Sequence, residues 1–213
     1  MTRQNAHLVI PPSPKGRLVI VHENRGLEDH IRNVANRFAA LGYAVAAPDY
    51  LSPVGGSSTD FDDNIDRLKG VSRSDVADIT RYWLNLLNEV VPSSKCAVLG
   101  YCWGGGVVNH CATELSEMDA GIMFYGTAPS DESIPRIKAT LQLHYAENDE
   151  RINAGRDAYL AALSQAGVKH DAFIYAGAGH AFFNDTREDR HHAPSAALAF
   201  ERVSYFQLYL IKK

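Results

Sequence analysis

The sequence is poor in cysteine, with three among 213 residues, so the thiols cannot all pair with one another. Free thiols in a reducing compartment are the simpler expectation, which argues against a disulfide-stapled secreted scaffold. No apolar run approaches the length needed to cross a bilayer, and the first residues lead into no stretch typical of a signal peptide. We therefore expect a cytoplasmic protein that does not act at a membrane.

Clusters of positive charge are also missing. The formal net charge is −4, and no basic run occurs anywhere along the chain. Because a nucleic-acid surface needs concentrated cations, we expect no nucleic-acid partner. Two histidines stand together at His191 and His192, but this is not the spacing of a ligand pair on a helix. We expect no bound metal and no cofactor.

The remaining composition is typical of a globular protein, with 46% hydrophobic and 22% charged residues. No repeat, linker or boundary appears, which predicts one domain over residues 1–213. Near-continuous apolar runs, typical of buried parallel strands, alternate with helical patterns. Strands are predicted at 7–10 (an edge strand), 17–22, 43–47, 96–99, 120–125, 140–145 and 171–175, and helices at about 29–41, 74–90, 107–115, 153–166 and 194–211. This alternation predicts an α/β fold with a mostly parallel, doubly wound sheet.

One segment, 52–60, fits neither pattern, because it is too long for a turn and too small in side chain for a core. At the mouth of a parallel sheet such a loop is a candidate lid or pocket rim. A disordered surface loop is the alternative.

The chain is organised around the stretch 100–106, which follows the apolar run 96–99 and precedes a helical pattern. Its Gly100-x-Cys102-x-Gly104 pattern matches the nucleophile elbow of α/β-hydrolases, with cysteine in place of serine. The flanking glycines are needed because the strained elbow leaves no room for side chains where the helix crosses the strand. Cys102 is thus the predicted nucleophile, at a helix N-terminus whose dipole favours a thiolate. The alternative is a buried cysteine in an ordinary glycine-rich turn.

Two further polar residues, Asp149 and His180, are predicted at the carboxyl ends of later strands. Open α/β sheets place ligands at that edge, and nucleophile, acid, histidine is the chain order of an α/β-hydrolase triad. His180 would take the thiol proton, and Asp149 would accept the other ring N–H. Glu147 and Glu150 are alternatives for the acid.

Glu23 and Asn24 follow a central strand, where α/β-hydrolases carry the loop that donates one N–H to the oxyanion hole. We assign that donor to the backbone of Asn24 and the second to the backbone of Trp103. A buried Glu23 near Cys102 would disfavour a second anion and keep the resting cysteine a neutral thiol. The alternative for Glu23 is a surface carboxylate that caps the next helix.

These motifs resemble those of the dienelactone hydrolase family (carboxymethylenebutenolidases) over nearly the whole chain. The resemblance implies an α/β-hydrolase without a large cap domain, with Cys102, Asp149 and His180 as its triad. It also implies that Glu23 controls the thiol until substrate arrives. The matching segments are 22–26, 42–43 with 48–49, 100–105, 148–149 and 178–182.

The resemblance also shows where this chain departs from its pattern. Family members that act on dienelactone hold the substrate carboxylate with arginines, one of them four residues beyond the catalytic histidine. That position is Asn184 here, and Arg25 or Arg187 is the expected substitute. We expect Arg25, Tyr125, Phe182 and Asn184 to contact substrate, with core packing as the alternative for the two aromatic residues.

A thiolate leaves a tetrahedral intermediate more easily than an ordinary alkoxide, so a cysteine nucleophile suits acyl groups with stabilised leaving groups. We therefore expect a carboxylic ester hydrolase that acts on activated esters or enol lactones, as a monomer or homodimer. One alternative is a class I amidotransferase-like cysteine protein, although many of these place histidine where Trp103 stands. The other is a non-catalytic thiol-bearing module for binding or redox sensing.

Overall fold

Seven strands form one sheet in the order β1-β3-β2-β4-β5-β6-β7 in the computed structural model, which describes residues 5–92 and 94–211. Strand β1 runs antiparallel to β3, and the other neighbours are parallel, as predicted. The strands are β1 (Ala6–Val9), β2 (Gly16–Val21), β3 (Tyr43–Pro48), β4 (Cys96–Tyr101), β5 (Ala120–Phe124), β6 (Thr140–Asn148) and β7 (His170–Gly179). Residues 1–4 of the N-terminal segment considered above, and Ser93 in the turn before β4, lie outside the described residues.

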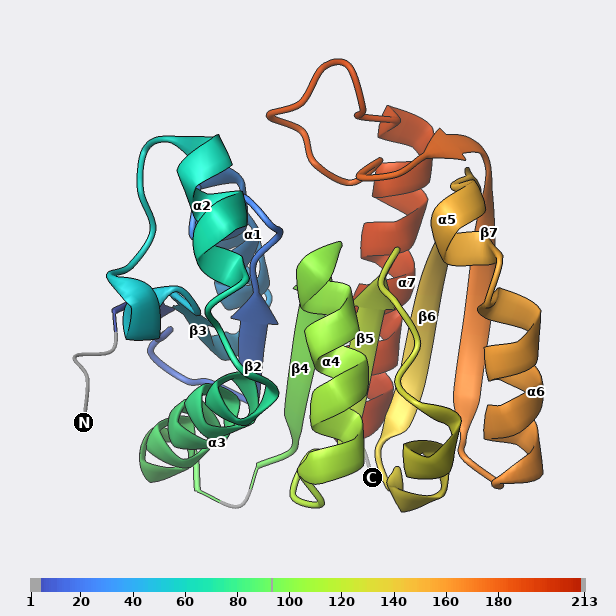
Figure 1. Cartoon of the computed structure of the whole chain (residues 1–213). Helices are drawn as coiled ribbons and strands as arrows, with labels where there is room; N and C mark the ends of the chain where they lie inside the picture. Colours follow the sequence, from blue (N-terminus) through green and yellow to red (C-terminus); the bar gives the residue numbers. More distant parts are fainter. Residues whose placement is uncertain (1–4, 93, 212–213) are drawn as a thin grey trace.

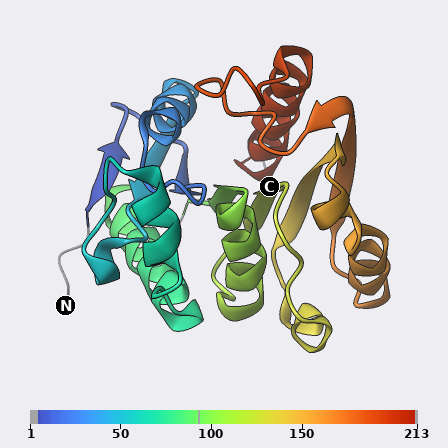
Figure 2. The ribbon, with the colours of Figure 1, turned by 45° about the horizontal axis from the view of Figure 1, so that its top comes forward.

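Helices cover both faces of this sheet, with α1 and α7 on one face and α3, α4 and α6 on the other (Figures 1 and 2). The inner strands β2, β3, β4 and β5 are buried along nearly their whole length, because both faces of the sheet are covered there. In β2, Leu18 and Ile20 pack toward α1, while Val19 and Val21 pack toward α3 and α4. The long helices are α1 (Asp29–Ala40), α3 (Arg73–Val90), α4 (Trp103–Glu114), α6 (Arg156–Gln165) and α7 (Ala193–Ile211). The shorter ones are η1 (Ser52–Val54), α2 (Phe61–Leu68), η2 (Asp131–Arg136) and α5 (Glu150–Asn153).

Three predicted helices differ from the structure. Helix α4 begins at Trp103, directly after its N-cap Cys102, rather than at the predicted 107. Helix α3 begins after Ser72 rather than at about 74, because Ser72 and Asp75 form a capping box. The Ser72 hydroxyl accepts from the Asp75 N–H at 3.0 Å, and the Asp75 carboxylate accepts from the Ser72 N–H at 2.9 Å. The predicted helix 153–166 is divided into α5 and α6, with Gly155 as the N-cap of the second.

The segment 52–60 is ordered and leads into α2, a helix that the sequence pattern did not predict. Asp60 caps α2 by accepting from the backbone N–H of Asp62 at 3.0 Å. Upstream, the buried Asp49 accepts from the backbone N–H of Ser57 at 2.7 Å. The disordered-loop alternative is therefore wrong, and the segment stands beside the carboxyl edge of the sheet (Figure 1).

The strand order creates a crevice at that edge. The chain passes from β2 outward to β3 and then returns to β4 on the other side of β2, so the connections that follow β2 and β4 diverge. Such switch points are where open α/β sheets bind ligands. Val21 is in register with Gly100, so the residues that follow these two strands emerge side by side. Among the helices of the described residues, none has the length and apolarity to cross a membrane.

Candidate active site

The turn after β4 has the geometry of a nucleophile elbow. Cys102 has φ +56° and ψ −115°, a conformation that non-glycine residues rarely adopt. A Cβ atom at Gly100 would overlap the carbonyl of Gly104, and one at Gly104 would lie 2.5 Å from the carbonyl oxygen of His22. Both glycines are therefore required by close backbone contacts, as the motif predicted.

The structure brings together the three residues of the predicted triad from the ends of β4, β6 and β7. His180 Nε2 lies 3.1 Å from Cys102 Sγ, and His180 Nδ1 lies 2.5 Å from Asp149 Oδ2. The ring is held by a carboxylate that only accepts, so Nδ1 carries a proton and Nε2 is free to accept the thiol proton. Asp149 is buried, and its other oxygen accepts from the backbone N–H of Ile152 at 3.4 Å.

The two alternative acids occupy other positions. Glu147 is exposed and its carboxylate accepts from the backbone N–H of Gly177 at 2.8 Å. Glu150 is exposed in the first turn of α5. Asp149 is therefore the carboxylate that contacts His180.

Two backbone N–H groups, those of Trp103 and Asn24, approach the sulfur from different segments, and each lowers the pKa of the Cys102 thiol. Trp103 opens helix α4, and Asn24 lies in the turn that follows β2. Donors that stabilise a thiolate from two sides are also placed to stabilise an oxyanion on a carbon bonded to that sulfur.

The environment nevertheless favours the neutral thiol. Burial raises the pKa of Cys102 to about 11, and the negative charge of Glu23 adds to this effect. The positive charge of Arg151 acts in the opposite direction. Sequence reasoning missed Arg151; the available signal was its position two residues after Asp149, at the same edge of the sheet.

Glu23 lies beneath the sulfur and is only 3% exposed. Burial raises its pKa to about 7, while hydrogen bonds from Asn184 Nδ2 at 2.6 Å and the Tyr125 hydroxyl at 3.4 Å lower it. Because the pKa of Glu23 in the folded protein lies above the ordinary 4.5, protonation of Glu23 favours folding. Its contribution to fold stability is fully present below about pH 4.5. The contribution is lost as pH rises through about 7.

Three residues predicted to contact substrate lie below the site. Asn184 is fully buried, and its amide donates to Glu23 and, at 3.3 Å, to Glu28. Tyr125 is fully buried with its ring centroid 5.0 Å from that of His180, and Phe182 packs 5.4 Å from Tyr125. The prediction that they line the pocket is corrected accordingly: Asn184 and Tyr125 donate to Glu23, Tyr125 packs against His180, and Phe182 packs against Tyr125.

Arg25, in contrast, lies on a cleft of about 510 Å³ beside the loop that carries Asn24. Its guanidinium stacks 3.6 Å over the ring of Phe61, and its Nε lies 3.6 Å from a carboxylate oxygen of Glu28. Arg187 also lines the cleft. The cleft is lined by Asn24, Arg25, Thr59, Asp60, Phe61, Asp62, Ile65 and Arg187. Within the described part of the chain, no cluster of three or more His, Cys, Asp or Glu side chains is arranged to hold a metal ion.

Comparison with known proteins identifies the family of this chain. The family model for the dienelactone hydrolase family matches residues 5–210. The chain belongs to the dienelactone hydrolase family. It is similar to a rat protein named carboxymethylenebutenolidase homolog, with 27% identity over 194 residues that cover 86% of this chain and 78% of the relative. It is also similar to Protein usf of Aquifex pyrophilus, with 28% identity over 211 residues that cover 91% and 88% of the two chains.

Solved structures confirm the α/β-hydrolase fold. A dienelactone hydrolase-like promiscuous phosphotriesterase from metagenomic libraries superposes with a TM-score of 0.81 at 18% identity, covering 97% of this chain and 98% of the other. A thermostable carboxyl esterase from Bacillus coagulans gives a TM-score of 0.76 at 13% identity, covering 98% and 94%. The protein is thus a member of a hydrolase family that acts on small molecules, which separates it from the class I amidotransferase-like alternative.

Proposed function

We propose that this dienelactone hydrolase family member hydrolyses activated esters or enol lactones through an acyl-enzyme on Cys102, with residues 1–213 acting as one domain. The observation that carries the proposal is the continuous contact from Cys102 Sγ through the His180 ring to Asp149, built on a strained elbow. A sulfur, a base and an orienting carboxylate in this order are the parts that nucleophilic acyl transfer needs.

Acylation begins with transfer of the Cys102 proton to His180 Nε2, which lies 3.1 Å away. The sulfur attacks the carbonyl carbon, and the negative charge on its oxygen is stabilised by the N–H groups of Asn24 and Trp103. The intermediate then expels the alcohol or enol oxygen, which takes the proton from His180. This leaves a thioester on Cys102.

Deacylation uses the same groups in reverse. A water molecule gives a proton to His180 Nε2 and attacks the thioester carbon, forming a second oxyanion at the same two N–H groups. The C–S bond breaks, the acid departs, and Cys102 recovers its proton from His180. Asp149 stabilises the imidazolium in both halves of the cycle.

The leaving group decides which esters react. In the first intermediate, the sulfur and the substrate oxygen compete to leave, and an unactivated alkoxide loses this competition. We expect kcat/KM for a nitrophenyl ester or an enol lactone to exceed that for an ethyl ester of the same acid by more than about a hundredfold, each tenfold corresponding to about 1.4 kcal/mol of barrier. Steady-state hydrolysis of matched pairs measures this ratio.

The intermediate itself can be trapped. Rapid acid quenching with a nitrophenyl ester, followed by intact-mass measurement and peptide mapping, is expected to place one acyl group on Cys102. Cys96 and Cys111 are internal controls, because both are buried and their sulfurs contact the Glu117 carbonyl and the Thr80 hydroxyl rather than a histidine. Equal rates on both ester classes would count against chemistry limited by the cysteine. Slow oxidation of Cys102 without acylation would favour the redox or binding module instead.

The cleft supplies a cation for an anionic substrate, and the contacts favour Arg25. Arg187 makes two hydrogen bonds to Asp189, both at 2.8 Å, whereas Arg25 Nε lies 3.6 Å from Glu28, beyond hydrogen-bond distance. Arg25 lies beside the Asn24 turn, and the Phe61 ring beneath it offers an apolar surface. We therefore assign Arg25 to binding a carboxylate on the acyl side of the substrate, with Phe61 contacting its hydrocarbon part.

The negative charge of Glu23 should tune the thiol in a pH-dependent way. Below about pH 6 Glu23 is protonated and exerts little effect, whereas above its pKa of about 7 its charge opposes thiolate formation. Glu23→Gln should therefore speed alkylation of Cys102 by iodoacetamide about threefold to tenfold at pH 8, and leave it unchanged at pH 5.5. Second-order alkylation rates across this range measure the effect.

Glu28→Gln is the matched control, because Glu28 also accepts from Asn184 but acts on Cys102 only indirectly, by raising the pKa of Glu23. Its alkylation rate at pH 8, where Glu23 is ionised in both proteins, should stay within about twofold of wild type. An unchanged profile for Glu23→Gln, or the same acceleration in both variants, would show that the Glu23 charge does not control the sulfur.

A further inference from the structure

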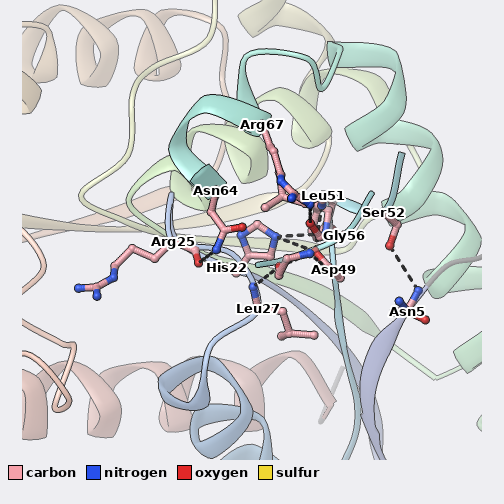
Figure 3. Close-up of polar contacts among 12 residues, drawn as sticks. Asn5, His22, Arg25, Leu27, Asp49, Leu51, Ser52, Gly56, Asn64 and Arg67 are labelled. Atoms are coloured by element: carbon pink, nitrogen blue, oxygen red, sulfur yellow. Dashed lines mark hydrogen bonds and ion pairs between the residues drawn. The ribbon is translucent and has the colours of Figure 1, made fainter. Parts of the chain in front are cut away.

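The turn that carries Asn24 is held by a hairpin formed by the segment 50–60 and helix α2. From α2, the Asn64 amide donates to the carbonyl of Arg25 at 2.8 Å (Figure 3). The same amide donates to the carbonyl of Ser58 at 2.8 Å and accepts from the Ser58 N–H at 2.7 Å. Asn64 is fully buried although α2 lies at the edge of the fold.

These contacts define the orientation of the Asn64 side chain. Its oxygen faces a backbone N–H, so its nitrogen must face the two carbonyls, and a flipped amide would lose all three hydrogen bonds. An aspartate at this position would have no donor when ionised and would place an oxygen against two carbonyl oxygens. The site therefore specifies asparagine by hydrogen bonding rather than by shape.

A second contact holds the other side of the same turn. The Leu27 N–H donates to the Ser57 hydroxyl at 2.8 Å, and that hydroxyl donates to Asp49 at 2.7 Å. Between these two anchors, Gly26 has φ +82°, and a Cβ atom there would lie 2.5 Å from Ser57 Oγ and 3.1 Å from Asn64 Nδ2. The glycine lets the hairpin close directly onto the turn.

The start of the turn is fixed by hydrogen bonds of the His22 ring. His22 Nδ1 donates to the Glu23 carbonyl at 2.7 Å, while His22 Nε2 accepts from the Tyr50 N–H at 3.1 Å. Burial lowers the pKa of His22, which keeps this pattern of one donor and one acceptor. Side chains thus hold the Glu23–Asn24 peptide, through His22, and the two peptides that follow Arg25, through Asn64 and Ser57. The Asn24 N–H, which belongs to the first of these peptides, donates to the sulfur.

We propose that Asn64 and Ser57 are positioning residues that hold the Asn24 N–H in the oxyanion hole, so that the α2 hairpin is part of the catalytic apparatus. This inference rests on the proposed function, because an oxyanion hole matters only for acyl transfer. Displacement of one donor by about 1 Å is enough to lower a rate about a hundredfold, and loss of one donor lowers it by about 10² to 10³.

The experiment compares two reactions of the same sulfur. Acylation by nitrophenyl acetate develops an oxyanion, whereas alkylation by iodoacetamide does not. Asn64→Ala is expected to slow single-turnover acylation of Cys102 about tenfold to a hundredfold, while alkylation changes by less than about threefold. The ratio of the two rates therefore reports the oxyanion hole separately from thiol exposure and pKa.

Arg67→Met is the matched control on the same helix. Arg67 also joins α2 to the segment 50–60, by donating to the Gly56 carbonyl at 2.8 Å, and it pairs with Asp63 of its own helix at 2.7 Å. None of these contacts reaches the turn 23–27. It should leave the ratio within about twofold of wild type. If acylation and alkylation fall together in Asn64→Ala, or if Arg67→Met lowers the ratio equally, Asn64 serves only the fold.

Ser57→Ala gives an independent measurement if Asn64→Ala does not fold. It removes the hydrogen bond from the Leu27 N–H and leaves Asn64 in place. It should lower the ratio in the same direction, and an unchanged ratio would overturn the proposal. Acylation of the wild-type protein distinguishes a failure of the proposed function from a failure of the positioning role. If its thiol is alkylated but never acylated, the proposed function fails; if it is acylated and both variants keep its ratio, only the positioning role fails.

Discussion

Cys102→Ala is expected to lower kcat/KM for a nitrophenyl ester by about 10⁴-fold or more, leaving only background hydrolysis. The loss should be this large because the sulfur forms the covalent bond in both halves of the cycle. In the acylation step, His180 Nε2 acts on the Cys102 sulfur that it contacts, and alanine leaves it no side chain to activate there. Initial rates with purified wild type and variant, at equal folded concentration by circular dichroism, measure the difference.

Cys102→Ser is the informative companion variant. A serine hydroxyl is a much weaker acid than a thiol, and the buried carboxylate of Glu23 further opposes an anion at this position. We expect the serine variant to fold normally and to retain at most about 1% of wild-type kcat. Its residual activity should depend on His180, so that adding His180→Ala removes it.

Substantial turnover by Cys102→Ala would place the nucleophile on another residue. Full activity in Cys102→Ser would contradict the tuning of the site to sulfur. Unfolding should not explain a loss of activity in either variant. The Cys102 side chain does not cap α4, and alanine can adopt the same elbow backbone as other L residues.

Much of the sheet was predictable because its strands are covered on both faces. A strand such as β4, buried along its whole length, must be apolar throughout, and this leaves a clear pattern in the sequence. The glycines of the elbow were predictable for a related reason: Gly100 and Gly104 face backbone atoms that cannot move aside. In both cases the surroundings restrict which residue types can occupy a position, so the restriction can be read from the sequence.

Helix α2 could not be predicted from apolar periodicity, because its buried residue is polar. Asn64 is fully buried, while Phe61 and Ile65 are each 39% exposed and face the cleft. The hydrophobic pattern of this helix therefore points away from the core. Its inward contacts are hydrogen bonds to backbone atoms 39 and 6 residues away, and single-sequence patterns do not report such contacts.

The direction of side chains at strand ends was also beyond the sequence. Tyr125 and Phe182 were placed correctly at the edge of the sheet, but Tyr125 has φ +39°, and Ala181, before Phe182, has φ +66°. These backbone turns direct both rings under the site instead of into the cleft. Asn184 follows the second turn and reaches Glu23 for the same reason.

The steric requirement at the elbow gives the second large prediction. Gly104→Ala would place a Cβ atom 2.5 Å from the His22 carbonyl oxygen and 2.6 Å from that of Val21, both on the backbone at the end of β2. Neither atom can rotate away, so α4 must shift from β2. We expect a loss of about 1 to 3 kcal/mol in the free energy of unfolding and of about a hundredfold in kcat.

The activity loss follows from the same geometry. The residues pushed apart carry the two proposed oxyanion donors, because Trp103 precedes Gly104 and Asn24 follows the end of β2. Gly106→Ala is the control within the same helix: its Cβ would meet only the Thr127 hydroxyl, at 2.6 Å, and that side chain can rotate. Both substitutions raise helix propensity by about 1 kcal/mol, so only the contact with β2 distinguishes them. Urea unfolding and kcat should therefore differ between the two variants, and the kcat of Gly106→Ala should stay within about threefold of wild type. If both variants lose the same stability and the same activity, the close approach of α4 to β2 is not what builds the site.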